Sequence, residues 1–96
     1  MDEPADLLNR VSDRDSFFAF VHALIADLQD ETVKEQMQPS SPWGPGANGW
    51  ENGAIEAFLD AALAWAKSTG IGETQGLPIP SWQSFARFLY AGKIYE

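Results

Sequence analysis

The 96-residue chain contains no cysteine and only one histidine, His22. Disulfide bonds and thiolate metal sites are therefore excluded, and any metal site would have to be built mainly from carboxylates. Asp27, Asp30 and Glu31 cluster in the sequence, but they lack the alternating oxygen ligands of an EF-hand loop. We expect no metal and no cofactor.

A catalytic centre also has little support. His22 lies one position off the apolar stripe of a predicted helix, and no glycine-framed serine elbow is present. A catalytic triad needs a base that a third group orients. A boundary or core histidine is the favoured interpretation, so we predict no catalytic residue and keep an enzyme as the less favoured alternative.

Basic residues are scarce, with six Lys and Arg against fourteen Asp and Glu and a net charge of −8. Binding to phosphates requires a basic patch, so a nucleic-acid partner is not expected. An acidic surface accelerates encounter with a basic protein, which is one interpretation of the charge. The alternative is that the charge only keeps the protein soluble.

Long hydrophobic runs are missing as well. The longest nearly apolar run, residues 17–26, is too short to span a bilayer. Residues 1–4 are acidic where a signal peptide would be basic. We therefore expect a cytoplasmic protein with no membrane partner.

The residues that are present favour helices. Hydrophobic residues make up 45% of the chain and recur at helical spacing between two loops rich in proline and glycine, 38–50 and 70–80. The sequence predicts one all-α domain over residues 1–96, a compact bundle of three main helices. A short leading turn over residues 4–10 would be a fourth, with Leu7, Leu8 and Val11 packing on the bundle.

Local signals predict the ends of the first helix. It begins at Ser12 or Asp13, and Ser12 with Asp15 forms a loose capping box. It ends either near Asp30 or at Met37, before Pro39.

The other two helices carry similar signals. Asn52 is the predicted N-cap of the second helix, which runs to about Ser68, and Gly70 follows as a left-handed cap. Ser81 is the predicted N-cap of the third helix.

Apolar stripes on the three helices predict a single core, because the helices have only one another to bury against. Its predicted members are Phe17, Val21, Leu24, Phe58, Leu59, Trp65, Trp82 and Phe85.

Acidic residues at helical spacing are candidates for binding a partner. Asp27 and Glu31, like Glu56 and Asp60, form a like-charged i,i+4 pair that mildly opposes its helix. A solvated face explains such pairs, and a docking patch for a basic partner is the sharper interpretation. Asp30 belongs to the first group, and the two groups form one negative surface if they face the same way.

Trp43 stands in the first loop without a periodic partner. Two interpretations remain open for it. It folds back as a lid on the core, or it is an exposed anchor for a partner, since Trp is enriched at interface hot spots.

Four motifs carry a resemblance: residues 12–17 (Ser-Asp-Arg-Asp-Ser-Phe), 50–52 (Trp-Glu-Asn), 80–82 (Pro-Ser-Trp) and 91–96 (Ala-Gly-Lys-Ile-Tyr-Glu). With them the chain resembles a family of small bacterial proteins of unknown function. The resemblance implies a compact helical form without assigned catalytic residues. The stretch 38–49 is longer and richer in Pro and Gly than the resemblance leads us to expect.

Together these observations favour a cytoplasmic protein-binding domain, with an immunity-type inhibitor of a basic toxin as one form of it. The predicted partner-binding residues are Asp27, Asp30, Glu31, Trp43, Glu56 and Asp60. The alternatives are a small enzyme or ligand-binding protein that uses residues 38–50 as a lid, and a homo-oligomeric structural domain.

Overall fold

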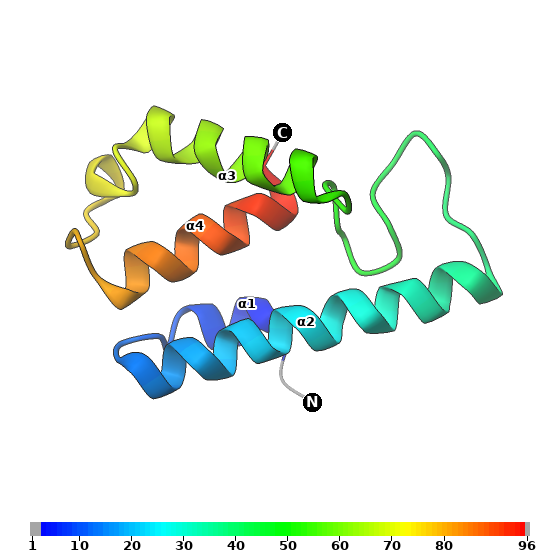
Figure 1. The fold of residues 1–96 in the computed structure, drawn as a ribbon, viewed down its shortest axis with the longest axis horizontal. Coiled ribbons are helices and arrows are strands. Elements are labelled where there is room, and N and C mark those ends of the chain that lie inside the picture. Colours follow the sequence, from blue (N-terminus) through cyan, green and yellow to red (C-terminus); the bar gives the residue numbers. More distant parts are fainter. Residues whose placement is uncertain (1–2, 96) are drawn as a thin grey trace.

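The computed structural model describes residues 3–95, so Glu96 of the C-terminal motif and the first two residues lie outside it. Within this range all regular secondary structure is helical, without a β-strand (Figure 1). The predicted all-α class, with three main helices and a short one before them, is confirmed. The elements are α1 (Pro4–Leu8), α2 (Arg14–Met37), α3 (Ile55–Thr69), a 3-10 turn (Glu73–Gln75) and α4 (Trp82–Ile94).

Helix α4 is the centre of the arrangement. Its most extensive contacts are with the antiparallel α3, and it also touches α1 and α2. Figure 1 shows α3 on one side of α4 and α2 on the other. Within residues 3–95 no Cα atom of α2 lies within 8 Å of one of α3, and the molecule is flat, with extents of 41 × 28 × 17 Å.

Side-chain caps set the start of two helices. Asp13 caps α2 by accepting a hydrogen bond of 2.8 Å from the Ser16 amide, and Ser81 caps α4 in the same way through Ser84 at 3.0 Å. Ser81 was the predicted cap. In α2 the capping box uses Asp13 and Ser16, so the predicted Ser12–Asp15 pairing is wrong.

The end of α2 agrees with the longer of its two predicted lengths, because the helix continues to Met37. Gly70 ends α3 in the predicted left-handed conformation, at φ 61°.

The prediction for Asn52 is wrong. Helix α3 begins three residues later at Ile55, and its N-cap Ala54 offers no side-chain hydrogen bond. The Asn52 amide instead donates to the carbonyls of Gly92 (3.2 Å) and Tyr95 (2.8 Å) at the end of α4. Carbonyls in the last turn of a helix lack intrahelical partners. The Asn52 amide therefore caps the end of α4 instead of the start of α3.

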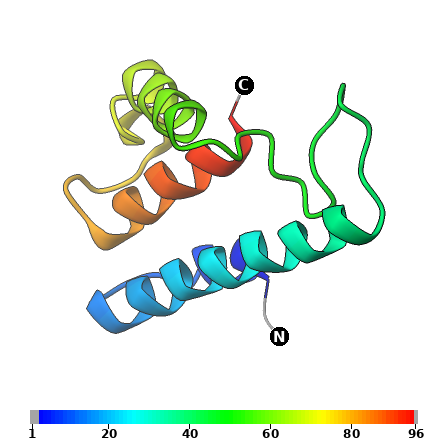
Figure 2. The same ribbon diagram turned by 45° about the vertical axis from the view of Figure 1, so that its right-hand side comes forward.

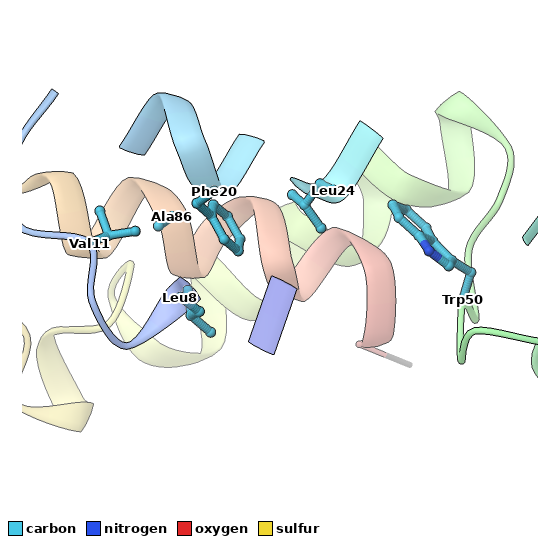
Figure 3. Close-up of a cluster of buried hydrophobic side chains, with 6 residues drawn as sticks. All are labelled: Leu8, Val11, Phe20, Leu24, Trp50 and Ala86. Atoms are coloured by element: carbon cyan, nitrogen blue, oxygen red, sulfur yellow. The ribbon is translucent and has the colours of Figure 1, made fainter. Parts of the chain in front are cut away.

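The buried core follows α4 from end to end (Figure 3). Its fully enclosed centre is Phe20, with 0% of its surface exposed. Two core residues come from the N-terminal segment, as predicted for Leu8 and Val11. The complete cluster is Leu8, Val11, Phe20, Leu24, Trp50 and Ala86.

The predicted core is correct only in part. Leu24 belongs to it, Trp65 is buried, and Phe17, Val21 and Phe58 pack against it half-buried. Three predicted members are exposed: Leu59 (54%), Phe85 (41%) and Trp82 (38%). The prediction assumed that all three stripes meet, whereas the backbones of α2 and α3 stay apart and leave Leu59 at the opening between them. Trp82 and Phe85 lie in the first turn of α4, where Trp82 packs against Phe17 at the edge of the core.

Candidate functional site

Three carboxylates one helical turn apart hold the first loop against α2. They are Asp27, Glu31 and Glu35, at i, i+4 and i+8, and each accepts hydrogen bonds from residues of the segment 38–50. We call these three residues the carboxylate ladder. The loop has no regular structure of its own, so the ladder supplies the backbone partners that a helix or sheet would otherwise provide.

Glu35 holds both sides of the loop. Its carboxylate accepts from the Ser40 amide (2.7 Å), the Ser40 hydroxyl (2.5 Å) and the Ala47 amide (2.8 Å). These hydrogen bonds, led by that of the Ser40 hydroxyl, hold the pKa of Glu35 below its usual value because they favour the ionised form.

Glu31 is buried, with 7% of its surface exposed. It accepts hydrogen bonds from the amides of Asn48 (2.9 Å) and Trp50 (3.3 Å). Gly46 packs so closely on the Glu31 carboxylate that a Cβ at this position would overlap it. The second half of the loop therefore packs against, and donates hydrogen bonds to, the buried Glu31 carboxylate.

Asp27 connects the loop to the last helix. Its Oδ2 accepts from the indole N–H of Trp50 (2.8 Å) and from the ammonium group of Lys93 (2.7 Å). Lys93 is 7% exposed, and its ammonium lies 5.4 Å from the centroid of the Trp50 ring. Removing either charge would leave the other buried without its ionic partner.

Asn48 ties the outer surface of α2 to the same loop. Its amide group donates to the Asp27 carbonyl (2.9 Å) and to the Asp30 carboxylate (3.0 Å), and it accepts from Lys34 (2.9 Å). Lys34 also pairs with Asp30 at 2.8 Å. The hydrogen bonds from Lys34 and Asn48 lower the pKa of Asp30, and the contact with Asp30 raises the pKa of Lys34.

The five acidic residues proposed from the sequence fall into two groups. Asn48 brings Asp27, Asp30 and Glu31 together, whereas Glu56 and Asp60 are exposed on α3 and form no ion pair among residues 3–95. Because α2 and α3 are not in contact, and Asp27 and Asp30 line a hollow with Glu3 and Pro4, the groups do not form one surface. Their role toward a partner stays a prediction.

Sequence reasoning missed Glu35, Asn48 and Lys93. A signal for Glu35 was available, because it extends the i,i+4 pair of Asp27 and Glu31 by one more turn next to a loop rich in proline and glycine. Lys93 carried no such signal, because its partner Asp27 is 66 positions away.

Trp43 is 94% exposed, so the expectation that it folds back as a lid is wrong. Figure 2 shows the loop rising from the C-terminal end of α2 and turning back toward the last turns of this helix, apart from α3 and α4. Trp43 belongs to the part of the loop between Ser40 and Ala47, the two residues that Glu35 holds.

A separate apolar groove of about 270 Å³ opens where α2 and α3 fail to meet. One wall is the α2 face of Val21, Ile25 and Leu28, and the other is the start of α3 with Phe58 and Leu59. Leu89 of α4 and Trp50 also line it, while residues 38–49 do not. The loop is thus no cover for this groove.

Neither a metal centre nor a catalytic constellation emerges from the described part of the chain. Residues 3–95 contain no group of three or more His, Asp and Glu side chains placed to hold a metal ion. His22 is exposed on α2. No helix in this range is both long enough and apolar enough to cross a membrane.

A model of a family of unknown function, DUF7660, matches residues 13–96. The chain belongs to this family. The match begins at the Asp13 cap and includes the loop, the ladder and both walls of the groove, so all of these lie within the family's domain. No curated protein and no solved structure matches the chain.

Proposed function

We propose that this member of the family is a cytoplasmic protein-binding domain, and that Trp43 is its main anchor on the partner. The observation that carries the proposal is a 94% exposed tryptophan on a loop that the carboxylate ladder fastens at both ends. An exposed indole gains about 150–250 Å² of burial when it enters a pocket.

The fastening of the loop favours binding. Ordering a flexible segment on association costs free energy, and a segment that is already held avoids most of that cost. Pro42 and Pro45 flank Trp43 and Gly44, and each proline restricts its own φ angle. The ladder and the prolines therefore present the indole in a limited set of positions.

The charge of the chain supports a basic partner. Among the described basic residues, Lys93 is buried against Asp27, Lys34 pairs with Asp30, and Arg14 pairs with Asp15. Glu56 and Asp60 have no such partner within residues 3–95. An acidic surface of this kind accelerates encounter with a basic protein. An immunity-type inhibitor of a basic toxin is one form of this function, and rescue of cells that express such a toxin would test it.

The anchoring role is tested with Trp43→Ala. The immobilised chain and its variant would each be exposed to host lysate, and the retained proteins would be identified by mass spectrometry. For the identified partner, dissociation should become about 30-fold faster, which corresponds to a hot spot of about 2 kcal/mol. Met37→Ala is the matched control, because Met37 is 83% exposed and lies next to the same loop. Equal dissociation rates for Trp43→Ala and Met37→Ala would contradict the proposal.

Steering requires a different pair of variants. Charge reversal at Asp27 and Glu31 would release the loop, so the test uses Glu56→Gln with Asp60→Asn. This double variant should slow association and weaken its salt dependence while dissociation changes little. The double variant Asp6→Asn/Glu73→Gln removes the same charge from exposed sites elsewhere. If both double variants behave alike, only the net charge matters and the steering is not local.

A further inference from the structure

We infer that the apolar groove between α2 and α3 binds an amphipathic α-helix with basic residues along one flank. This inference rests on the proposed function in one respect, because the helix is taken to be a segment of the same basic partner. It is carried by a separate part of the molecule, since residues 38–49 do not line the groove.

The groove is the place where the domain lacks a helix–helix contact. Helix α4 packs against both α2 and α3, but the backbones of these two come no closer than 8 Å between Cα atoms. Large apolar side chains are left open on both walls, with Ile25 52% and Leu59 54% exposed, and Leu89 of α4 reaches the groove between them. A guest helix lying along the groove would pack against all three helices at once.

The exposed apolar face is long enough for about two turns of a helix. On α3 it continues from Ile55 (80% exposed) through Leu59 to Leu63 (47%), at i, i+4 and i+8. This stripe covers about 12 Å along the axis, or two turns, at 1.5 Å per residue. A guest that presents apolar side chains at i, i+3 or i+4, and i+7 matches this spacing.

The walls favour a helix over an extended segment. They are helices, whose interior backbone groups are already paired, and no strand edge is available within residues 3–95. An extended segment in the groove would bury its own amides and carbonyls without partners. A helix satisfies these groups internally and offers only side chains.

Charge on the rim selects a basic guest and orients it. Glu56 and Asp60 follow Ile55 and Leu59 by one position on α3, and both are exposed. The opposite rim on α2 carries the uncharged Gln29 and the single histidine, His22. The basic flank of the guest should therefore face α3. A second copy of this chain would instead oppose Glu56 and Asp60 to another molecule with a net charge of −8.

The probe for the test is a synthetic peptide of about 14 residues, four helical turns, with Leu at helix-spaced positions and Lys elsewhere. A peptide of the same composition with the Leu periodicity scrambled keeps the charge and loses the apolar face. Isothermal titration should give tighter binding of the periodic peptide, with helix formation seen by circular dichroism. NMR of the labelled chain should place the largest shift changes at Val21, Ile25 and Leu59, and smaller ones around Trp43.

The substitutions in the groove walls replace exposed side chains, so the variants should still fold. Ile25→Gln combined with Leu59→Gln should weaken binding of the periodic peptide at least about tenfold. Val33→Gln is the control on the same helix, since Val33 is 58% exposed and lies outside the groove, and it should change binding by less than about twofold. Glu56→Gln with Asp60→Asn should weaken binding more than Asp6→Asn with Glu73→Gln.

Three outcomes would overturn the inference. The first is equal binding of the periodic and scrambled peptides, or equal binding to Ile25→Gln/Leu59→Gln and the unchanged chain. The second is a dimer in analytical ultracentrifugation that the wall variant dissolves, which would assign the groove to a second copy. The third is a natural partner that depends on Trp43 but not on Ile25 and Leu59. In that third case the proposed function stands and only the groove assignment fails.

Discussion

The two halves of α2 are attached to the rest of the protein by different kinds of contact. The first half, residues 14–25, is held by apolar contacts through Phe20 and Leu24, which are 0% and 6% exposed. The second half, residues 26–37, is held to the rest of the chain by Asp27, Glu31 and Glu35. One continuous helix therefore carries an apolar core at one end and a polar anchor at the other.

The difference shows what each kind of contact can hold. Apolar burial is non-directional and suits helix on helix, where backbone groups are already paired. The loop 38–50 has amides that no helix or sheet pairs, and a carboxylate accepts from several of them at once, as Glu35 does from Ser40 and Ala47. The first half should therefore control global stability, and the second half should control the position of Trp43.

The largest effect is expected in the apolar half. Phe20→Ala should lower the free energy of unfolding by about 3–5 kcal/mol, because it removes a fully buried ring and leaves a cavity. Phe18→Ala is the control on the same helix, since Phe18 is 57% exposed, and it should change stability by less than about 1 kcal/mol. Urea denaturation measures both. Similar losses for the two variants would mean that the core does not centre on Phe20.

A smaller loss is expected where the two halves meet. Asp27→Asn should cost about 3 kcal/mol, because Lys93 would stay buried without its counter-charge. Adding Lys93→Met should restore much of that loss, since a buried pair can be replaced by an apolar side chain of similar size. Asp15→Asn, which breaks an exposed pair with Arg14, should cost less than about 1 kcal/mol. Urea denaturation of these three variants and the unchanged chain measures the losses. A double variant less stable than Asp27→Asn alone would refute the pairing argument.

The smallest effect concerns Glu35 and acid. Its pKa is lowered in the folded chain, so its contribution is present above the usual glutamate pKa of about 4.3 and is lost as the pH falls through the lowered value. Acidification through this lowered pKa should release the loop around Ser40 and Ala47. NMR titration of these two amides measures the release, and Glu35→Gln should abolish the titration. A midpoint at or above the usual glutamate pKa would contradict the hydrogen-bonding pattern.

Much of the helical layout could be read from local signals. Ser81, Gly70 and Pro39 mark helix ends, and each acts through backbone groups only a few residues away. The same reasoning failed at Asn52, because its amide serves the carbonyls of Gly92 and Tyr95, 40 and 43 positions away. A cap between distant segments has the same residue type as a local cap, so the sequence alone does not distinguish them.

For the candidate site, too, some features follow from the sequence and others only from the tertiary structure. The sequence by itself determined that the chain is helical, acidic and without cysteine, and that Trp43 has no place in an apolar stripe. Only the tertiary structure decided that Asp27 and Glu31 hold a loop, that Trp43 is exposed, and that α2 and α3 leave a groove between them. The physical reason is that helix caps and periodicity depend on neighbours within about one or two turns. Which faces meet depends instead on how all the helices share one central partner, and here that partner is α4.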